Sequence, residues 1–401
     1  MCRTGVRPSW RTESWQGSCS ISPGRLLSSA LISNGFSPRI LIAGGGTGGH
    51  VYPAVAIADA IGGINRQAVV EFAGSRTGIE WRLVPESGYS IHHISVQGLQ
   101  RRLTLKNLTL PFVVAKGLKE ARDLIRHFDA DVVVGTGGYV ALPLLLAARY
   151  LHRRTAIQEQ NAFMGLTNRI ASRFADQIYI AFDEAAPKSK GSTTRITGNP
   201  VRQNLAESHK QEALDYFEFS DVRQVVFMTG GSIGSQAMNE AMATIVRSLL
   251  SKRGIGVIWQ TGERYFERFQ TSVPDHPRLR LKAYVDRMDM AYSAADLMIC
   301  RSGASTCSEL MLTGTPAILI PSPNVSEDHQ TKNALSLVSA GAATLLEETR
   351  MHHELLDATK DLLIDTARLD RMSANALKLA KPNAAREIAE DILDLARTRI
   401  R

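Results

Sequence analysis

Four glycine-rich turns carry most of the residues whose types and spacing suggest chemistry. The first turn, residues 44–50, reads Gly-Gly-Gly-Thr-Gly-Gly-His, and the second spans residues 135–139. The other two span residues 229–235 and 301–306, and Glu309 follows the last of them closely. Glycines allow backbone N–H groups to approach an oxyanion, and the N-terminus of a following helix adds a favourable potential. The four turns therefore predict sites for phosphate-bearing ligands.

The first turn also fits a dinucleotide-binding fingerprint. Gly44, Gly46 and Gly49 have the required spacing, and Glu71 follows Gly49 by 22 residues, near the position of a ribose-binding acid. An NAD(P)-dependent oxidoreductase is therefore a serious alternative. A P-loop is excluded because His50 stands where that motif has a lysine. One dinucleotide, however, does not need a second glycine turn in each half of the chain, whereas two phosphorylated ligands suit this arrangement.

Each turn joins a short apolar run to a segment that is expected to be a helix. The apolar runs are residues 40–43, 132–134, 225–228 and 297–300. Strands that alternate with helices predict parallel βαβ units with helices on both faces of the sheet, and such folds bind ligands at the carboxyl ends of the strands. We therefore expect an α/β fold of two doubly wound, Rossmann-like domains that face each other across a cleft.

The expected domain boundaries follow from the point where the pattern restarts. The first domain is predicted over residues 38–199 and the second over residues 200–375, with a link near Pro200. Residues 376–401 are predicted to contain a helix that packs back on the first domain. Residues 1–37, rich in arginine, serine and glycine, are expected to be a disordered extension or to precede the true start of the protein.

The composition is that of an ordinary globular protein. The chain has 401 residues, of which 44% are hydrophobic and 21% charged, and this favours two folded domains over bulk disorder. No apolar run is long enough to span a bilayer, and the four cysteines form no Cys-x-x-Cys pair, which argues against a disulfide framework and a zinc site. The net charge of +8 is compatible with nucleic acid, an anionic membrane surface or diphosphate ligands.

Taken together, the motifs resemble one enzyme family. The first turn with Pro53 behind it, and the second turn, are similar to the glycine loops of the MurG family, the UDP-N-acetylglucosamine:N-acetylmuramoyl-pentapeptide-diphosphoundecaprenol N-acetylglucosaminyltransferases of bacterial wall synthesis. At Ile233 many members have glutamine, so this chain keeps the backbone anion site there but lacks the side-chain amide. The other matching segments follow in the family's order: residues 158–161, 165–168, 197–202, 230–232, 300–309 and 328–333.

The resemblance implies a hexosyltransferase of the GT-B type that needs no cofactor or metal. UDP-GlcNAc is expected on the second domain, and the lipid-linked acceptor, lipid I, on the first. N-acetylglucosamine would pass with inversion to the 4-hydroxyl of the muramoyl residue, and the product would be lipid II for peptidoglycan synthesis. The alternatives are the NAD(P)-dependent oxidoreductase and a nucleotide-sugar-binding protein without catalytic activity.

The resemblance also assigns roles to individual residues. His50 is the expected base that takes the acceptor proton, because histidine titrates near neutral pH, with Glu159 as the alternative base and phosphate binding as the alternative role of His50. Glu309 is expected to accept hydrogen bonds from the ribose hydroxyls, and His329 is an alternative to Gln330 as a sugar contact. The expected UDP-GlcNAc contacts are Thr47, Gly48, Gly49, Asn161, Arg202, Ser232, Val285, Ala304, Ser305, Thr306, Glu309 and Gln330. The expected acceptor-diphosphate contacts are Gly45, Gly46, Gly137, Gly138 and Tyr139.

A segment at residues 99–114, which we call the basic-apolar segment, suggests contact with a membrane surface. Apolar residues flanked by cations favour an anionic lipid interface, although the same pattern is typical of a segment that covers a domain core. The lipid acceptor favours the membrane, so we expect a peripheral protein on the cytoplasmic face of the inner membrane, with other cell-wall synthesis proteins as partners and no nucleic acid. The residues expected to contact anionic phospholipid are Leu103, Leu105, Leu108 and Phe112, with Arg101, Arg102 and Lys106.

Two motifs resemble metal-binding sequences but are not expected to bind a metal ion. Asp129 and Asp131 form an Asp-x-Asp pair, but they precede an expected strand and so lie at its amino end, away from the ligand edge. The adjacent histidine pairs, at residues 92–93 and 352–353, do not have metal-ligand spacing. The sequence therefore predicts no metal site.

Overall fold

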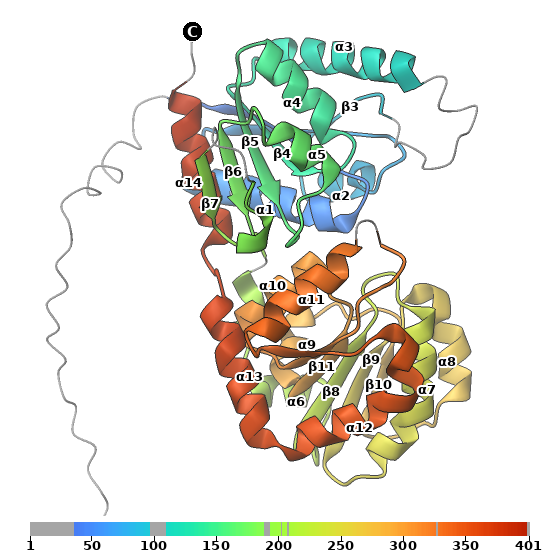
Figure 1. The fold of residues 1–401 in the computed structure, drawn as a ribbon. Helices are drawn as coiled ribbons and strands as arrows, with labels where there is room; N and C mark the ends of the chain where they lie inside the picture. Colours follow the sequence, from blue (N-terminus) through green and yellow to red (C-terminus); the bar gives the residue numbers. More distant parts are fainter. Residues whose placement is uncertain are drawn as a thin grey trace, which may run out of the picture. The chain divides into compact units, whose positions relative to one another are not determined.

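The computed structural model describes residues 36–96, 110–187, 193–201, 203–206, 208–325 and 328–398. All described helices and strands lie in one compact unit, Ser37–Arg401. They form two parallel sheets with helices on both faces, which we call the first lobe and the second lobe (Figure 1). This confirms the predicted pair of doubly wound domains.

The first lobe is built on a seven-stranded parallel sheet in the order β3-β2-β1-β4-β5-β6-β7. Because β1 pairs with both β2 and β4, the strand order reverses beside β1, and this is the point where doubly wound sheets bind ligands. The strands are β1 (Arg39–Gly44), β2 (Val69–Gly74), β3 (Ile91–His93), β4 (Val132–Gly137), β5 (Arg154–Glu159), β6 (Gln177–Ile180) and β7 (Thr193–Ile196).

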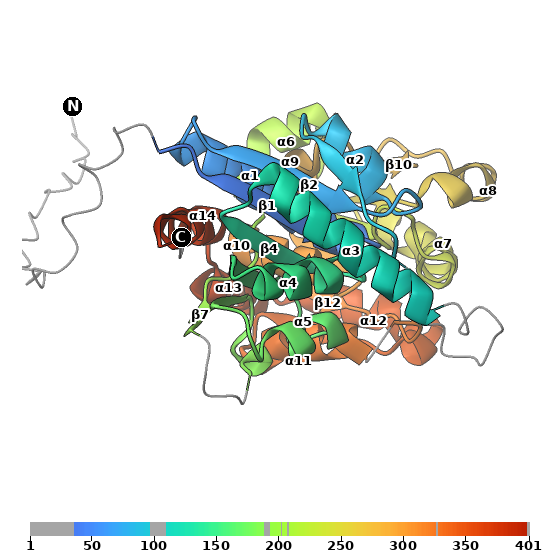
Figure 2. The same cartoon turned by 90° about the horizontal axis from the view of Figure 1, so that it is seen from above.

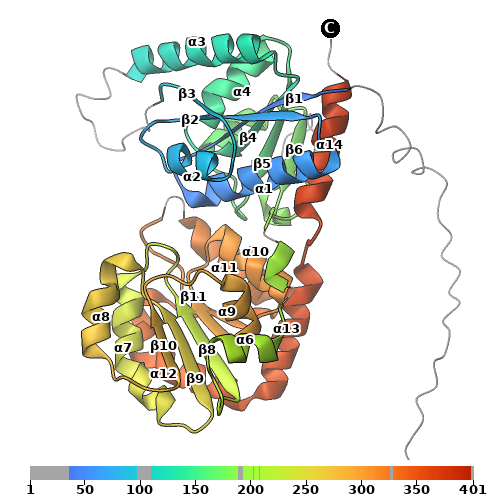
Figure 3. The same cartoon turned by 180° about the vertical axis from the view of Figure 1, so that it is seen from behind.

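Helices cover both faces of this sheet because its strands are apolar on both sides. Leu41 and Ala43 of β1 belong to the core shared with α3, α4 and α5, whereas Ile40 and Ile42 point to the opposite face, where α1 and α2 lie (Figures 1 and 3). The helices are α1 (Gly48–Ile64), α2 (Glu80–Glu86), α3 (Leu110–Phe128), α4 (Ala141–Tyr150) and α5 (Leu166–Ala171), and one helical turn, η2 (Asp183–Ala185), follows β6.

The second lobe repeats this plan with a six-stranded parallel sheet in the order β10-β9-β8-β11-β12-β13. Here β8 pairs with β9 and β11, so the strand order reverses beside β8. The strands are β8 (Gln224–Thr229), β9 (Ile255–Gln260), β10 (Leu279–Lys282), β11 (Leu297–Cys300), β12 (Ala317–Leu319) and β13 (Ala343–Leu345).

Two hydrophobic cores sandwich the second sheet. Phe227 and Met298 face the core built with α9, α10 and α11, and Trp259 and Ile299 face the core built with α7 and α12. The helices are α6 (Lys210–Tyr216), α7 (Gln236–Leu250), α8 (Phe266–Ser272), α9 (Met288–Ala294), α10 (Ala304–Thr313), α11 (His329–Ser339), α12 (Met351–Ile364) and α13 (Thr366–Leu379). Single helical turns are η3 (Gln203–Ala206), η4 (Glu263–Tyr265) and η6 (Glu348–Arg350).

The last helix, α14 (Ala384–Arg397), returns to the first lobe. It packs against α1, and Asp391 forms an ion pair with Arg195 of β7. The guanidinium of Arg154 donates to the backbone carbonyl of Thr398 just after the helix. Figure 2 shows α14 beside the first sheet. The C-terminal segment therefore joins the lobe in which the first half of the chain folds.

Among the described residues, no helix has the length and apolar character needed to span a bilayer. The basic-apolar segment lies outside the described residues up to residue 109, which includes Arg101, Arg102, Leu103, Leu105, Lys106 and Leu108. Its end forms the start of α3, where the side chains of Phe112 and Val114 are exposed by 79% and 44%.

Candidate active site

The four glycine turns meet in two pairs, one at each strand-order reversal. In the first lobe, residues 44–50 follow β1 and residues 135–139 end the neighbouring β4. The Gly45 N–H donates to the carbonyl oxygen of Gly137 at 3.3 Å. At Gly138, where φ is +83°, a Cβ atom would lie 2.2 Å from the Gly45 carbonyl oxygen, so only glycine fits. Close backbone packing therefore unites the two turns into one surface.

His50 lies in the first turn of α1 on this surface. Its Nδ1 atom is 3.0 Å from Oε1 of Gln160, and the imidazole is half-buried. Gly137 packs against the ring, since a Cβ atom there would lie 2.7 Å from Nδ1. The ring is thus held from two sides at the ligand edge of the first sheet, as a base positioned for a substrate hydroxyl requires.

The backbone N–H groups of Gly45 and Gly46, which were expected to bind the acceptor diphosphate, have partners inside the protein. The Gly46 N–H donates to Oε2 of Glu80 at 2.9 Å, and the Gly45 N–H is used by Gly137. Glu80 is 1% exposed, and its other oxygen accepts from the backbone N–H of Ser75. An internal carboxylate therefore occupies the part of the turn that was expected to hold an external anion.

The start of α1 remains suited to an anion. Thr47 is the N-cap residue, but its side chain makes no capping hydrogen bond. Gly48 and Gly49 begin the helix, where N–H groups have no intrahelical acceptor. Tyr139, from the second turn, is 59% exposed on the same edge. Gly48 and Gly49 therefore supply the N–H groups of this turn that lie at the start of α1, whereas those of Gly45 and Gly46 have internal partners.

Glu159, the alternative base, is buried with both oxygens occupied. Oε1 accepts from the backbone N–H and the side-chain amide of Asn161 at 3.0 and 3.2 Å. Oε2 accepts from the Gly165 N–H at 3.1 Å and from the Asn168 amide at 2.9 Å. A carboxylate with these donors stabilises a loop, and it has no access to an acceptor hydroxyl because it is 1% exposed. The geometry therefore favours His50 over Glu159 as the base.

Asn333 of α11 connects the loop after β5 to the second lobe. Its Oδ1 atom accepts from the Ala162 N–H at 2.8 Å, and its Nδ2 atom donates to Oδ1 of Asn161 and to the carbonyl oxygen of Ser302. Asn333 is fully buried. Asn161, an expected sugar contact, thus has its side-chain amide bonded to Glu159 and Asn333.

The fourth turn leads into α10, and the first N–H groups of this helix lie at its N-terminal end. Gly303 is the N-cap and offers no side-chain cap, so the N–H groups of Ala304, Ser305 and Thr306 lack intrahelical acceptors. This is the arrangement that binds phosphate at a helix N-terminus. Glu309 follows one turn later on the same helix.

Glu309 is oriented by a buried tyrosine. The Tyr292 hydroxyl donates to Oε2 of Glu309 at 2.8 Å, and the Glu309 side chain is half-buried. Burial, followed by the nearby Glu309 carboxylate, raises the pKa of Tyr292 well above its usual value. The tyrosine therefore remains a donor at neutral pH and holds the carboxylate in one position.

The third turn packs tightly against the neighbouring strand. A Cβ atom at Gly234, where φ is +77°, would lie 2.0 Å from the Thr261 carbonyl oxygen. Ser235 caps α7 by accepting from the Met238 N–H, and Arg301 donates to the Ser235 hydroxyl at 2.7 Å. Ser232 stays exposed at the tip of the turn, where a ligand can reach it.

Two expected donor contacts are already engaged inside the protein. The Val285 N–H, which could otherwise contact uracil, donates to Oε1 of Gln260 at 2.8 Å, and Val285 is buried. Oε1 of Gln330 accepts from the Ser322 N–H at 2.8 Å. Arg202 lies outside the described residues.

The residues that supported other chemistry have structural partners. Glu71 lies inside β2 and contacts His92 at 2.6 Å, so it is not at the strand end where a ribose-binding acid belongs. Asp131 accepts from the Arg39 N–H, and Asp129 accepts from Arg153, both at the amino end of β4. Within the described residues, no group of three or more histidine, cysteine, aspartate or glutamate side chains has metal-binding geometry.

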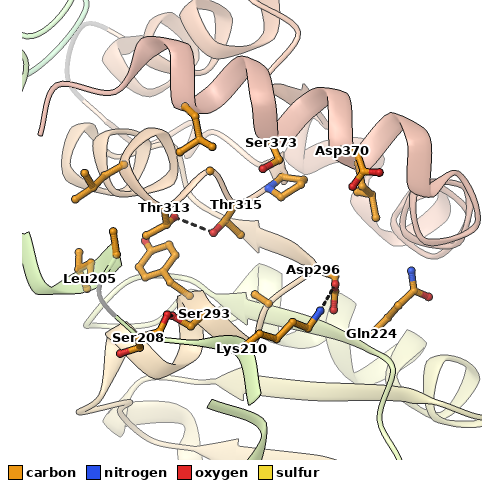
Figure 4. A pocket seen from close by; sticks show the side chains of 18 of the residues that line it. Leu205, Ser208, Lys210, Gln224, Ser293, Asp296, Thr313, Thr315, Asp370 and Ser373 are labelled. Atoms are coloured by element: carbon orange, nitrogen blue, oxygen red, sulfur yellow. Dashed lines mark hydrogen bonds and ion pairs between the residues drawn. The ribbon is translucent and has the colours of Figure 1, made fainter. Parts of the chain in front are cut away.

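A cavity of about 640 Å³ lies in the second lobe but at the other edge of its sheet. Its lining includes Gln224 at the start of β8, Asp296 just before β11 and Pro316 just before β12. Lys210 and Asp296 form an ion pair in its wall, and the hydroxyls of Thr313 and Thr315 are 2.8 Å apart (Figure 4). Ligands of doubly wound folds bind at the carboxyl edge, so this cavity lies at the opposite edge from the candidate active site, although Tyr292 lines it and also donates to Glu309.

Sequence reasoning missed Gln160, Tyr292, Asn333 and Glu80 as parts of the site. Gln160 and Asn333 lie inside the segments 158–161 and 328–333 that carried the family resemblance, so a signal was present. Tyr292 and Glu80 lie on helices outside those segments, and only the tertiary structure shows that they reach Glu309 and the first turn.

Comparisons with known proteins agree with this geometry. The glycosyltransferase family 28 N-terminal domain matches residues 40–180, and the glycosyltransferase family 28 C-terminal domain matches residues 225–392. A Salinibacter ruber protein named UDP-N-acetylglucosamine–N-acetylmuramyl-(pentapeptide) pyrophosphoryl-undecaprenol N-acetylglucosamine transferase is 49% identical over 360 residues, which cover 90% of this chain and 97% of the relative. A Lactiplantibacillus plantarum protein of the same name is 38% identical over 87% of this chain and 97% of its own.

Solved structures support the same assignment. The crystal structure of Acinetobacter baumannii MurG superposes with a TM-score of 0.73 at 31% identity and covers 89% of this chain and 99% of its own. A Neisseria meningitidis UDP-GlcNAc 2-epimerase, at 13% identity and a TM-score of 0.60 over 90% of this chain and 100% of its own, shares the fold alone. The resemblance seen in the sequence is confirmed, and the chain belongs to glycosyltransferase family 28 and, within it, to the MurG family of N-acetylglucosaminyltransferases.

Proposed function

We propose that this protein transfers N-acetylglucosamine from UDP-GlcNAc to the 4-hydroxyl of the muramoyl residue of lipid I, with inversion, to form lipid II. The observation that carries the proposal is the pairing of two anion-binding helix N-termini, each beside a strand-order reversal, with His50 on one and Glu309 on the other. Relatives that share up to 49% of their residues with this chain have names that describe this transfer.

The second lobe supports binding of the donor. The N–H groups of Ala304, Ser305 and Thr306 would donate hydrogen bonds to the diphosphate, and Glu309 would accept hydrogen bonds from the ribose hydroxyls. Uracil would lie near Val285, where the N–H group is bonded to Gln260 and the backbone carbonyl would make the contact. The exposed Ser232, together with Arg202, would complete the phosphate contacts.

The first lobe supports binding of the acceptor and the proton transfer. The sequence assigned Gly48 and Gly49 to UDP-GlcNAc, but here they are proposed to bind the acceptor diphosphate, with Tyr139 and the backbone of Gly138 beside it. His50 would take the proton of the acceptor hydroxyl while the oxygen of that hydroxyl forms a bond to C1 of the donor sugar. The bond between C1 and the diphosphate oxygen breaks on the opposite side, and UDP leaves as an anion stabilised by α10.

We further propose that the transfer needs no metal ion. The charge that develops on the departing diphosphate can be stabilised by the helix N-terminus of α10 and by arginine, and both are groups of this chain. Transfer that persists in excess chelator is the expected result, and full loss of activity that Mg²⁺ or Mn²⁺ restores would contradict it.

The basic-apolar segment and the start of α3 are proposed to touch an anionic membrane surface. The exposed Phe112 and Val114 continue the apolar positions of that segment onto α3. Contact there would bring the first lobe close to a lipid-anchored acceptor. The protein would then act as a peripheral protein at the cytoplasmic face of the inner membrane.

A transfer assay tests the proposed function. The purified chain is given UDP-GlcNAc and a lipid I analogue with a short prenyl chain, and the disaccharide product and released UDP are quantified. His50→Ala is expected to bind UDP-GlcNAc normally and to lose about 10²- to 10⁴-fold in kcat. No disaccharide from the wild-type chain, or near-normal turnover by His50→Ala, would refute the transfer or the base assignment, respectively.

A further inference from the structure

We propose that Gln160 is a positioning residue that fixes the tautomer of His50, so that Nδ1 carries the hydrogen and Nε2 presents the lone pair that accepts a proton. The proposal rests on the proposed role of His50 as base, but the tautomer is measurable without any transfer. It is carried by a chain of buried side-chain amides that runs from His50 to α10.

The orientation of the Gln160 amide is fixed by its neighbours. Nε2 of Gln160 lies 2.7 Å from the Thr136 carbonyl oxygen and 3.2 Å from the Gln158 carbonyl oxygen, and it also donates to Oε1 of Gln158. All of these neighbours are acceptors, so the amide oxygen cannot take this place. Oε1 of Gln160 therefore faces His50, and Gln160 is 1% exposed, which excludes solvent from the arrangement.

The tautomer of His50 follows from this orientation. Oε1 of Gln160 is only an acceptor, and Nδ1 of His50 lies 3.0 Å from it, so Nδ1 must be the donor. A neutral imidazole has one N–H, and Nε2 is then the nitrogen with a free lone pair. The opposite tautomer would place two acceptors against each other at a half-buried position, which is unfavourable.

The chain of amides continues into the second lobe with the same polarity. Nε2 of Gln158 donates to Oδ1 of Asn199 at 2.9 Å. Nδ2 of Asn199 donates to the Gln160 carbonyl oxygen at 3.0 Å and to the Ser308 hydroxyl of α10 at 2.9 Å. Gln158, Gln160 and Asn199 are all buried, so each of these groups depends on its partner. The tautomer of the base is thereby tied to the helix that is proposed to hold the UDP diphosphate.

The test uses long-range proton–nitrogen NMR of the full chain with ¹⁵N-labelled histidine. The chain has ten histidines, and the signals of His50 are assigned by their loss in His50→Gln. In the wild type at a pH where His50 is neutral, the expected pattern is a protonated Nδ1 and an unprotonated Nε2. An Nε2–H pattern in the wild type would overturn the proposal without any variant.

Substitutions separate positioning from simple structural support. Gln160→Met removes the acceptor and is expected to give mixed tautomers and a kcat lower by roughly 10- to 100-fold, with an unchanged KM for UDP-GlcNAc. The matched control is Thr359→Val, which removes a different buried hydrogen bond, in α12, and should change neither tautomer nor kcat. If Gln160→Met kept the wild-type tautomer, the proposal would be wrong.

The outcome also separates this proposal from the proposed function. An Nδ1–H pattern in a chain that transfers no sugar would support the tautomer assignment and refute the transfer. An Nε2–H pattern in a chain that makes the disaccharide would refute the assignment and leave the transfer intact.

Discussion

Removal of the Tyr292 hydroxyl is expected to weaken UDP-GlcNAc binding through Glu309. The hydroxyl is buried and donates to Oε2 of Glu309 at 2.8 Å. In Tyr292→Phe the carboxylate loses the bond that orients it, and it must be reordered when the ribose binds. The ring itself stays in the core, so the second lobe should keep its fold.

The magnitude follows from the type of bond that is lost. A hydrogen bond to a charged acceptor contributes about 1.5–3 kcal/mol, but water or ligand groups recover part of it at a half-buried carboxylate. We therefore expect a loss of roughly 0.7–1.4 kcal/mol in binding free energy, which is about a 3- to 10-fold increase in Kd.

The assay is isothermal titration of UDP-GlcNAc into each variant. The matched control is Tyr179→Phe, because Tyr179 of β6 is equally buried but its hydroxyl has no hydrogen-bond partner among the described residues. This control should leave Kd unchanged, and its free energy of unfolding should stay equal or rise. An unchanged Kd in Tyr292→Phe, or an equal loss in both variants, would show that the Tyr292 hydroxyl does not orient Glu309 for the ribose.

A double-mutant cycle then tests the route of the effect. If Tyr292 acts through Glu309, Tyr292→Phe should change Kd little in a Glu309→Ala background. Additive losses in the double variant would show that the tyrosine contributes independently of the carboxylate.

Three further predictions concern other parts of the protein. Burial raises the pKa of Cys300 well above its usual value and that of Cys307 to about 12. Both cysteines should therefore resist iodoacetamide in the native state and react fully in denaturant, as peptide mass spectrometry would show. Fast labelling of the native protein would contradict this. Hydrogen bonds from Arg287 and Ser208 lower the pKa of Asp289 to about 2, below its unfolded value. In urea unfolding, Asp289→Asn should therefore lower the free energy of unfolding by about 2 kcal/mol at neutral pH, and this loss should disappear as pH falls from about 4 towards 2. A loss that grows in acid would be inconsistent. Reversal of the three cations of the basic-apolar segment to glutamate should weaken binding to phosphatidylglycerol vesicles and leave UDP binding unchanged, whereas equal vesicle binding would argue against the membrane surface.

The fold was predictable because its signals are local. Each apolar run followed by a glycine turn and a helix is contained in about twenty residues, and the right-handed βαβ rule then brings the turns to one edge. The turns after β1 and β4, and those after β8 and β11, therefore lie together as the sequence predicts.

The sequence does not show where a distant side chain occupies a backbone group. Nothing near Gly46 shows that Glu80, 34 residues away, will bind its N–H group. The same holds for Val285, whose N–H is taken by Gln260 from a neighbouring strand. Glycine turns predict where N–H groups cluster, but the packing of the folded chain decides which of these groups a ligand can use.

The amide chain illustrates the same limit for catalysis. The segment Gln-Glu-Gln-Asn at residues 158–161 carries part of the family resemblance, and Glu159 was the predicted alternative base because carboxylates can act as bases. In the structure the glutamate holds its own loop, and the neutral Gln160 contacts the imidazole. Glu159 is the last residue of β5 and Gln160 follows it, and only the tertiary structure shows which of the two meets His50.

The central claim is that the start of α10 and Glu309 hold the uridine diphosphate of the donor. The most direct test is a crystal structure of the chain with UDP. We expect the diphosphate at the N–H groups of Ala304, Ser305 and Thr306, with the ribose hydroxyls on Glu309. Density for UDP at the glycine turns of the first lobe, or in the cavity at the opposite edge of the second sheet, would contradict it.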